Sequence, residues 1–144
     1  MSNTKPTFKV QYDNFIGGKF VPPVKGEYFD NVSPIDGKVF TKAARSGKED
    51  VELALDAAHA AFATWSKTSA AYRSGILNKI ADVMQAHLDE LAVIETIDNG
   101  KQIRETVNVD LPLCIDHFRY FAGVIRAEEG TISEHDENTV SIVL

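Results

Sequence analysis

The order of patterns along the chain limits its fold more than any other feature. Short strand-like segments come first, a long helical block follows, and a strand-like pattern returns at the end. In the helical block, apolar residues recur at spacings of four and three, which indicates helices with one apolar face. The strand-like segments, the last one included, have no obvious sheet partner inside the chain, and short hairpins alone are marginally stable in water. We therefore predict a segment of an α/β fold whose helices lie against a sheet that the 144 residues do not contain.

The first third of the chain reads as short strands with sharp turns. Gly17-Gly18 separates two apolar runs, which is the pattern of a two-residue hairpin turn. Residues 33–37 form a second turn, and residues 1–13 read as a flexible N-terminal arm. Strands are expected at residues 14–16, 19–21, 28–32 and 38–43.

About four helices are expected after residue 46. Ser46 and Glu49 fit a capping box at the start of the first helix. The buried side of this helix is predicted to be the stripe Val51, Leu55, Ala58, Phe62 and Trp65. Ser69 caps the second helix, a third begins near Asp89 and stops at Asn99-Gly100, and the fourth spans residues 101–128. Within the fourth, Asp110 is a plausible N-cap because Pro112 fits only a first turn. Gly130 is expected to end that helix, with strands at 131–133 and 139–144.

Composition excludes several classes of function. The chain has 15 Lys and Arg against 21 Asp and Glu, a net charge of −6, and its basic residues are dispersed. This balance disfavours a nucleic-acid partner. No apolar run approaches the roughly 20 residues that a bilayer span needs. A single cysteine and a polar N-terminus without a secretory core predict a cytoplasmic protein.

Candidate catalytic groups in the chain are few. Cys114 and His117 stand three apart on a helix and could pair, but no orienting group is evident, so we interpret Cys114 as a packing residue among its apolar neighbours. His59, His87 and His135 lack zinc-site spacing and are expected at the surface. No glycine-rich nucleotide motif is present. We therefore predict no catalytic and no cofactor-binding residue in this segment.

Glu95 and Asp98 are two acidic residues three apart on a predicted helix. They could share acid–base work, but a solvated helix face is the simplest interpretation. Asp98 also precedes the helix-ending Asn99-Gly100, where backbone carbonyls point outward. A carboxylate beside free carbonyls can bind a hard cation through oxygen.

Five motifs, in order, resemble the NAD(P)-dependent aldehyde dehydrogenases over residues 14–144. The sharpest is residues 95–101, Glu-Thr-Ile-Asp-Asn-Gly-Lys, which is similar to the family's E-T-x-D-N-G-K signature. The residues of these motifs most resemble those of the acetaldehyde-oxidising branch of the family. The other motifs lie at residues 14–21, at residues 31–37, at residues 60–77 with Arg73 and Leu77, and at residues 118–123.

This resemblance implies an oxidoreductase that converts an aldehyde to the carboxylic acid with NAD or NADP. In the family, a cysteine attacks the carbonyl, hydride passes to the cofactor, and a glutamate-activated water releases the acid. All of these groups lie downstream of the segment present here. Cys114 does not match the nucleophile position, so the resemblance implies that the chain alone is inactive and binds no cofactor itself.

The resemblance also assigns structural roles. Residues 14–130 correspond to the N-terminal part of the cofactor-binding domain and residues 131–144 to the start of an oligomerisation arm, which implies a homodimer or homotetramer. Val109 and Leu113 correspond to the wall of the aldehyde tunnel. Asn31, Val32 and Asp98 correspond to a monovalent-cation site.

Two hypotheses follow. In the first, the chain is the N-terminal portion of an aldehyde dehydrogenase acting on a small aldehyde. In the second, it is a non-catalytic helical assembly module that pairs with another copy or a partner through its terminal strand.

Overall fold

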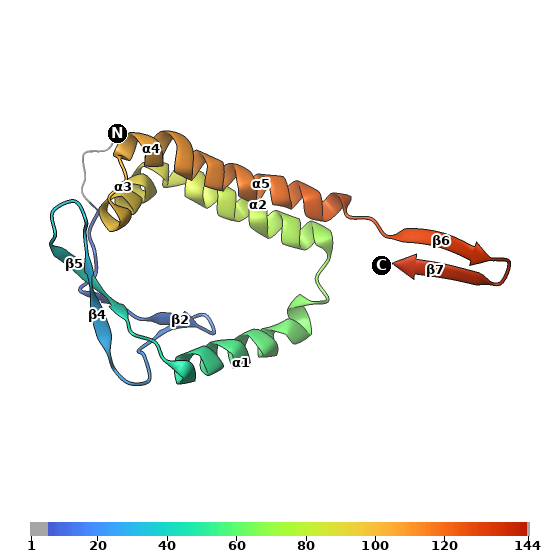
Figure 1. Ribbon diagram of the computed structural model, residues 1–144, viewed down its shortest axis with the longest axis horizontal. Coiled ribbons are helices and arrows are strands. Elements are labelled where there is room, and N and C mark those ends of the chain that lie inside the picture. Colours follow the sequence, from blue (N-terminus) through green and yellow to red (C-terminus); the bar gives the residue numbers. More distant parts are fainter. Residues whose placement is uncertain (1–5, 144) are drawn as a thin grey trace.

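The computed structural model describes residues 6–143 and combines short strands with long helices (Figure 1). The strands in this part of the chain are β1 (Gln11–Tyr12), β2 (Asn14–Ile16), β3 (Lys19–Val21), β4 (Tyr28–Val32), β5 (Val39–Ala44), β6 (Thr131–Asp136) and β7 (Thr139–Val143). The helices are α1 (Lys48–Trp65), α2 (Ala70–Ala86), α3 (Leu88–Asn99), α4 (Ile103–Glu105), the π-helix η1 (Thr106–Asp110) and α5 (Leu111–Ala127). Among residues 6–143, none of the helices combines the length and the apolar character that a membrane span needs.

The N-terminal strands pair within the chain. β4 and β1 flank β5, antiparallel and parallel respectively, and β2 and β3 form the predicted hairpin. Gly17 and Gly18 have φ of +58° and +79°, the left-handed backbone that such a turn requires. The expectation of unpartnered strands was wrong here. The segment 1–13, predicted as an arm, contains β1, while residues 1–5 lie outside the described range.

Helix α1 begins one residue later than predicted. Its N-cap is Gly47, whose N–H donates to the Asp50 carboxylate at 2.8 Å, so the expected pair of Ser46 and Glu49 was wrong. The Ser46 hydroxyl instead donates to Asn14 Oδ1 at 2.8 Å. Asp50, 4 % exposed, also accepts the Val24 N–H at 2.8 Å. These bonds join the start of α1 to the strand region.

The apolar stripe of α1 is not buried, although the helix itself was predicted correctly. Phe62 is 64 % exposed, and Val51, Leu55 and Trp65 are also exposed. Among the described elements, β2 is the main contact of α1, and the other elements contact α1 weakly or not at all. Figure 1 shows it crossing the molecule apart from the other long helices.

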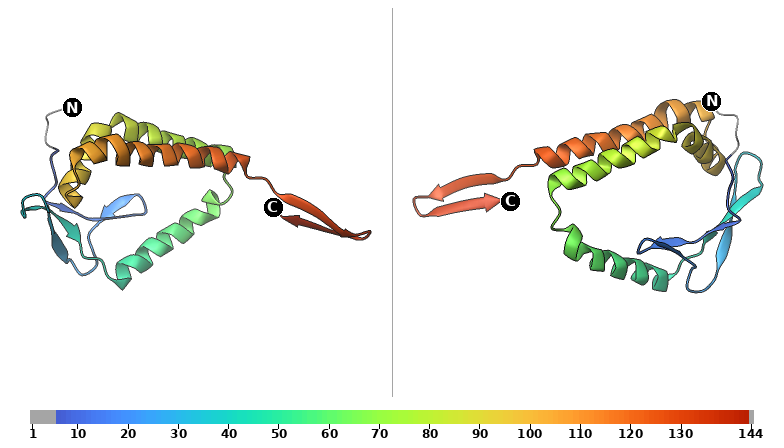
Figure 2. Two further views of the ribbon diagram at one scale, coloured as in Figure 1. Left: turned by 45° about the horizontal axis from the view of Figure 1, so that its top comes forward. Right: turned by 180° about the vertical axis from the view of Figure 1, so that it is seen from behind.

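The buried core lies where α2 packs along α5. Both views of Figure 2 show the two helices side by side over most of their length. Ala81, Ile115 and Ala122 are at most 3 % exposed. The buried Ser74 hydroxyl donates to the Ala122 carbonyl at 2.7 Å, which ties the two helices together. Ser69 caps α2 as predicted, accepting the Tyr72 N–H at 3.1 Å.

The region between α3 and α5 departs from regular helix. Gly100 ends α3 in the left-handed conformation, φ +79°, as predicted. The expected interruption near residue 110 is a π-helical turn, in which the Leu111 N–H reaches the Thr106 carbonyl. Asp110 stands at the N-cap position of α5, as predicted, but it has helical φ and ψ and its side chain makes no capping hydrogen bond. Helix α5 ends at Ala127, three residues before Gly130.

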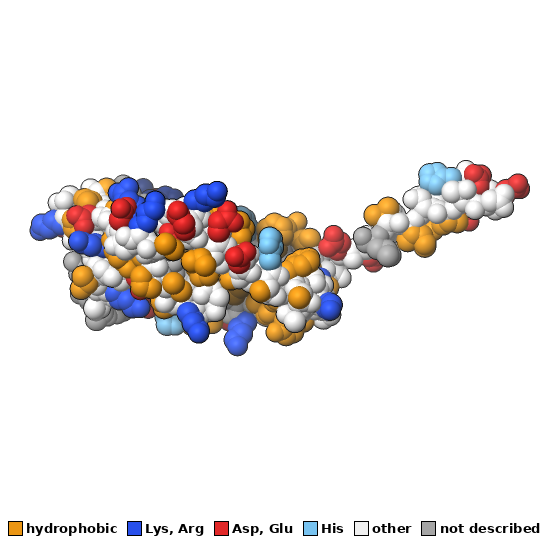
Figure 3. Space-filling view, turned by 90° about the horizontal axis from the view of Figure 1, so that it is seen from below, with side chains coloured by type: hydrophobic (Ala, Val, Ile, Leu, Met, Phe, Trp, Pro, Cys, Tyr) orange, Lys and Arg blue, Asp and Glu red, His pale blue; other side chains and the backbone are white. Residues whose placement is uncertain are grey.

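The C-terminal strands form a hairpin that projects from the helical body (Figures 1 and 3). β6 and β7 pair antiparallel, with Ile132 opposite Ile142, so the expectation that the last strand lacks a partner here was wrong. Ile132, Val140, Ile142 and Val143 are each more than half exposed. The predicted strand end at Leu144 lies outside the described residues.

Candidate functional site

The apolar face across η1 and α5 is the first candidate region. Leu111 and Ile115 of α5 are buried, and α2 packs along this helix. Val109 and Leu113, four residues apart, are 49 % and 50 % exposed on a different side. Residues at this spacing share one helix face. The structure therefore leaves the two predicted tunnel residues exposed beside each other along the helix.

The cysteine of the chain lies at the surface. Cys114 is exposed, so the predicted burial among apolar neighbours was wrong. His117 is exposed too, as are His59, His87 and His135, as predicted. Among the described residues, no cluster of three His, Cys, Asp or Glu could hold a metal ion.

The second candidate region joins β4 to the end of α3. The Asn31 amide donates to the Asp98 carboxylate at 2.7 Å, which brings together two of the three residues predicted for a monovalent cation. The ladder between β4 and β5 shifts register between Asn31 and Val32. Such an irregularity leaves ladder groups of the strand unpaired. Val32, the third residue, is 46 % exposed next to it.

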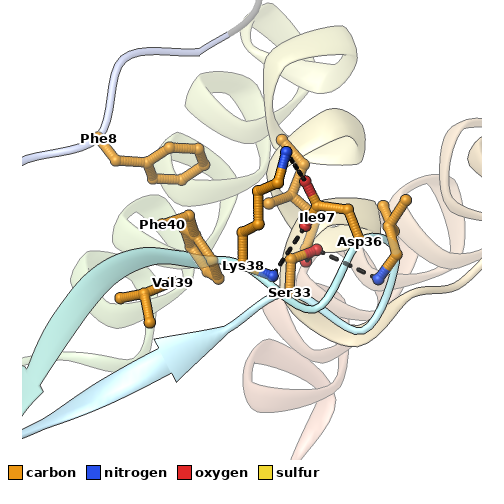
Figure 4. A pocket seen from close by; sticks show the side chains of 8 residues that line it. Phe8, Ser33, Asp36, Lys38, Val39, Phe40 and Ile97 are labelled. Atoms are coloured by element: carbon orange, nitrogen blue, oxygen red, sulfur yellow. Dashed lines mark hydrogen bonds and ion pairs between the residues drawn. The ribbon is translucent and has the colours of Figure 1, made fainter.

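The turn between β4 and β5 sits directly on the end of α3. The buried Ser33 hydroxyl donates to the Ile97 carbonyl at 2.6 Å, so it satisfies one of the free carbonyls of the last helical turn. A β-carbon on Gly100 would lie 2.7 Å from Pro34 Cγ. Figure 4 shows the pocket beside this junction, about 450 Å³, with Phe8 and Phe40 across from Ser33 and Ile97.

An ion pair not foreseen from the sequence links Lys101 to Asp110. The Lys101 ammonium donates to Asp110 Oδ1 at 2.7 Å and lies 2.6 Å from Oδ2. This hydrogen bond is the main reason why the pKa of Lys101 is raised. The two residues are nine positions apart, which is not the spacing of three or four that brings side chains together on one helix. In the sequence, Lys101 is notable only as part of the E-T-x-D-N-G-K motif, and Asp110 only for its position shortly before Pro112.

The family assignment rests on most of the chain. Residues 20–144 match the model of the aldehyde dehydrogenase family. An aldehyde dehydrogenase of Deinococcus radiodurans is 67 % identical over 94 % of this chain and 26 % of its own length. A long-chain-aldehyde dehydrogenase of an Acinetobacter species is 63 % identical over 97 % and 28 %. Acetaldehyde dehydrogenase 2 of Cupriavidus necator is 60 % identical over 93 % and 26 %.

A solved relative supports the same fold. The crystal structure of PnpE in complex with nicotinamide adenine dinucleotide aligns with a TM-score of 0.85 and 38 % identity, over 88 % of this chain and 26 % of that one. The α/β fold class and the resemblance predicted from the sequence are thereby confirmed. The chain spans about a quarter of the length of the proteins it matches. This 144-residue chain belongs to the aldehyde dehydrogenase family.

Proposed function

We propose that the polypeptide carrying this segment is an oxidoreductase that converts an aldehyde to its carboxylic acid with NAD or NADP. The observation that carries the proposal is the family match over residues 20–144, together with relatives named for aldehyde and acetaldehyde oxidation. The solved relative that holds nicotinamide adenine dinucleotide supports the choice of cofactor. When bound, the cofactor would accept the hydride from the aldehyde carbon.

In this proposal, the segment builds and shapes the enzyme but performs no chemical step. Cys114 is exposed, and its position does not match the nucleophile of the family. Residues 14–130 form part of the cofactor-binding domain, whose dinucleotide-binding residues lie outside the segment. Residues 131–144 begin the arm through which copies assemble as a dimer or tetramer. The exposed apolar residues of the β6–β7 hairpin suit such a contact.

Val109 and Leu113 are proposed to line the tunnel that admits the aldehyde. Their side chains are half exposed and apolar, as the wall of a channel for a small uncharged substrate requires. A small aldehyde such as acetaldehyde is the preferred substrate in this proposal. Because one relative is a long-chain-aldehyde dehydrogenase, the preference for the carbon-chain length of the aldehyde is the first property to measure.

Asn31, Val32 and Asp98 are proposed to hold a monovalent cation at the junction of β4 and α3. The carboxylate of Asp98 and the backbone oxygens at the irregular Asn31–Val32 step supply hard oxygen ligands. This site would stabilise the junction rather than take part in chemistry. We place the whole enzyme in the cytoplasm, without nucleic-acid or membrane partners.

The test compares this chain with the longer polypeptide that contains it. Mixed with NAD+ and acetaldehyde, the longer polypeptide should produce NADH, followed at 340 nm, and the 144-residue chain should not. NADH formation by the short chain would contradict its assigned inertness. A longer polypeptide that binds partners through this segment but oxidises no aldehyde with NAD+ or NADP+ would favour the assembly-module hypothesis.

A further inference from the structure

The ion pair between Lys101 and Asp110 connects the segment after α3 to the last residue of η1. Lys101 follows the left-handed end of α3, and its own N–H donates to Asn99 Oδ1 at 2.8 Å. Asp110 is the last residue of η1, and its side chain is 29 % exposed against 48 % for Lys101. The ammonium meets both carboxylate oxygens at 2.6 and 2.7 Å. The end of α3 is thus tied to the start of α5.

The element that this pair holds is a π-helical turn with a clear cause. Pro112 has no N–H and its ring would crowd the carbonyl of Asn108, so a regular α-turn is disfavoured there. The chain widens instead, with the Leu111 N–H bonded to the Thr106 carbonyl. The fully buried Thr106 hydroxyl, 3.0 Å from that of Thr96, fixes the other end of the turn. Turns of this kind are frequent at functional sites.

The π turn sets the phase between Val109 and Leu113. Leu111 and Ile115 are buried and α5 packs along α2, so the rotation of α5 is fixed by its packing. A turn closed by an i→i+5 hydrogen bond holds more residues than the roughly 3.6 of an α-helical turn. The angle around the axis between Val109, inside the turn, and Leu113, after it, therefore differs from the angle in a regular α-helix. Asp110 is next to Val109 in this turn, so a contact that holds Asp110 also holds the backbone that carries Val109.

We propose that Lys101 and Asp110 are a positioning pair that holds the π turn and thereby sets the shape of the aldehyde tunnel at Val109 and Leu113. This inference rests on the proposed function, because it assigns the pair a role in selecting aldehydes by size. Neither residue touches the substrate. The pair acts by keeping Val109 and Leu113 at a fixed angle to each other around the helix axis.

The experiment uses the longer polypeptide and the ratio of kcat/KM for hexanal to kcat/KM for acetaldehyde. Lys101→Met and Asp110→Asn should each change this ratio by about fivefold, mainly through KM, as expected when a residue remote from the ligand alters coupling. Lys101→Arg keeps the charge and should preserve the ratio. Lys42→Met breaks an exposed pair with Asp30, 3.7 Å apart on the strands, and is the matched control that should also preserve it.

A second readout separates this inference from the proposed function. Hydrogen exchange of the amides at residues 106–111 should become faster in Lys101→Met than in the wild type and in Lys42→Met. An unchanged ratio in folded Lys101→Met and Asp110→Asn would overturn the role in selectivity. If the wild type oxidises no aldehyde, the proposed function fails, and unchanged exchange at the π turn would then overturn the positioning role as well.

Discussion

Helices α2 and α1 show similar amphipathic patterns but end in different surroundings. Along α2 the apolar side meets α5, and Ala81, Ile115 and Ala122 are almost fully buried. Along α1 the apolar residues remain open, with Phe62 at 64 % and Val51 at 54 % exposure. Periodicity thus identifies an apolar face in both helices. It does not say whether the partner of that face is close in sequence.

The contrast also shows which residues hold each helix. The α2–α5 pair is stabilised along its length by apolar packing and by the bond from Ser74 to Ala122. Helix α1 is anchored at its first turn, where Asp50 receives bonds from Gly47 and Val24. We therefore expect the stability of the 144-residue chain to depend strongly on the first region and weakly on the body of α1.

The largest effect should come from Ile115→Ala. Removing a buried Ile side chain loses apolar burial and leaves a cavity, so the free energy of unfolding should fall by about 2–5 kcal/mol. Phe62→Ala is the matched change on α1, and in the 144-residue chain it should alter stability by less than about 0.5 kcal/mol. Urea denaturation measures both. Equal losses would show that α1 is packed in solution and would remove the contrast.

Gly100→Ala tests the junction that supports α3. The new β-carbon would lie 2.7 Å from Pro34 Cγ at a backbone φ of +79°. Strain of this kind costs about 1–3 kcal/mol, and the melting temperature should fall accordingly. Gly75→Ala is the control within α2, where a β-carbon meets nothing within 4 Å. Gly75→Ala should leave the melting temperature unchanged or raise it. An equal fall in the melting temperature of both variants would show that the contact at Pro34 is not the cause of the loss.

Ser74→Ala tests the polar tie between α2 and α5. The hydroxyl is buried and donates to a carbonyl at 2.7 Å, so its loss should cost about 1 kcal/mol of unfolding free energy. Thr64→Ala removes an exposed hydroxyl that bonds only within α1. Chemical denaturation should separate the two variants. A larger loss for Thr64→Ala would reverse the ranking of the two regions.

The smallest effect concerns pH and the anchor of α1. The N–H groups of Gly47 and Val24 lower the pKa of Asp50, so the folded state prefers the charged carboxylate. Its contribution is present above the unfolded pKa of about 3.9 and is lost as pH falls through the lower folded value. Asp50→Asn should lower the melting temperature at neutral pH by a few degrees and flatten its fall in acid. Asp56→Asn, on the exposed body of α1, should leave the acid profile as in the wild type.

Local features of the fold were predictable because their causes are local. The cap at Ser69, the turn at Gly17-Gly18 and the stop at Gly100 each depend on one side chain or one backbone conformation. The start of α1 was missed by one residue because Ser46 with Glu49 and Gly47 with Asp50 have the same spacing. Bonds from Asn14 and Val24 to Asp50, which are distant in sequence, decide between them.

The candidate sites were predictable only through the family motifs. The sequence motifs identified the residues, and the structure joins Asn31 to Asp98 across 67 positions. The pairing of β6 with β7 was missed because its turn, Glu137-Asn138, lacks the glycine that usually signals a tight hairpin. The contact of Lys101 with Asp110 follows from a π turn, and no side-chain period predicts that turn.

The contact between Pro34 and Gly100 has a practical consequence for anyone who recombines enzymes of this family. The ring of Pro34 occupies the space that any side chain at position 100 would need. A chimera that exchanges only the β4–β5 loop, or only the end of α3, would separate two surfaces that fit each other. Crossover points should therefore keep both segments from the same parent, and natural variation at the two positions should be correlated.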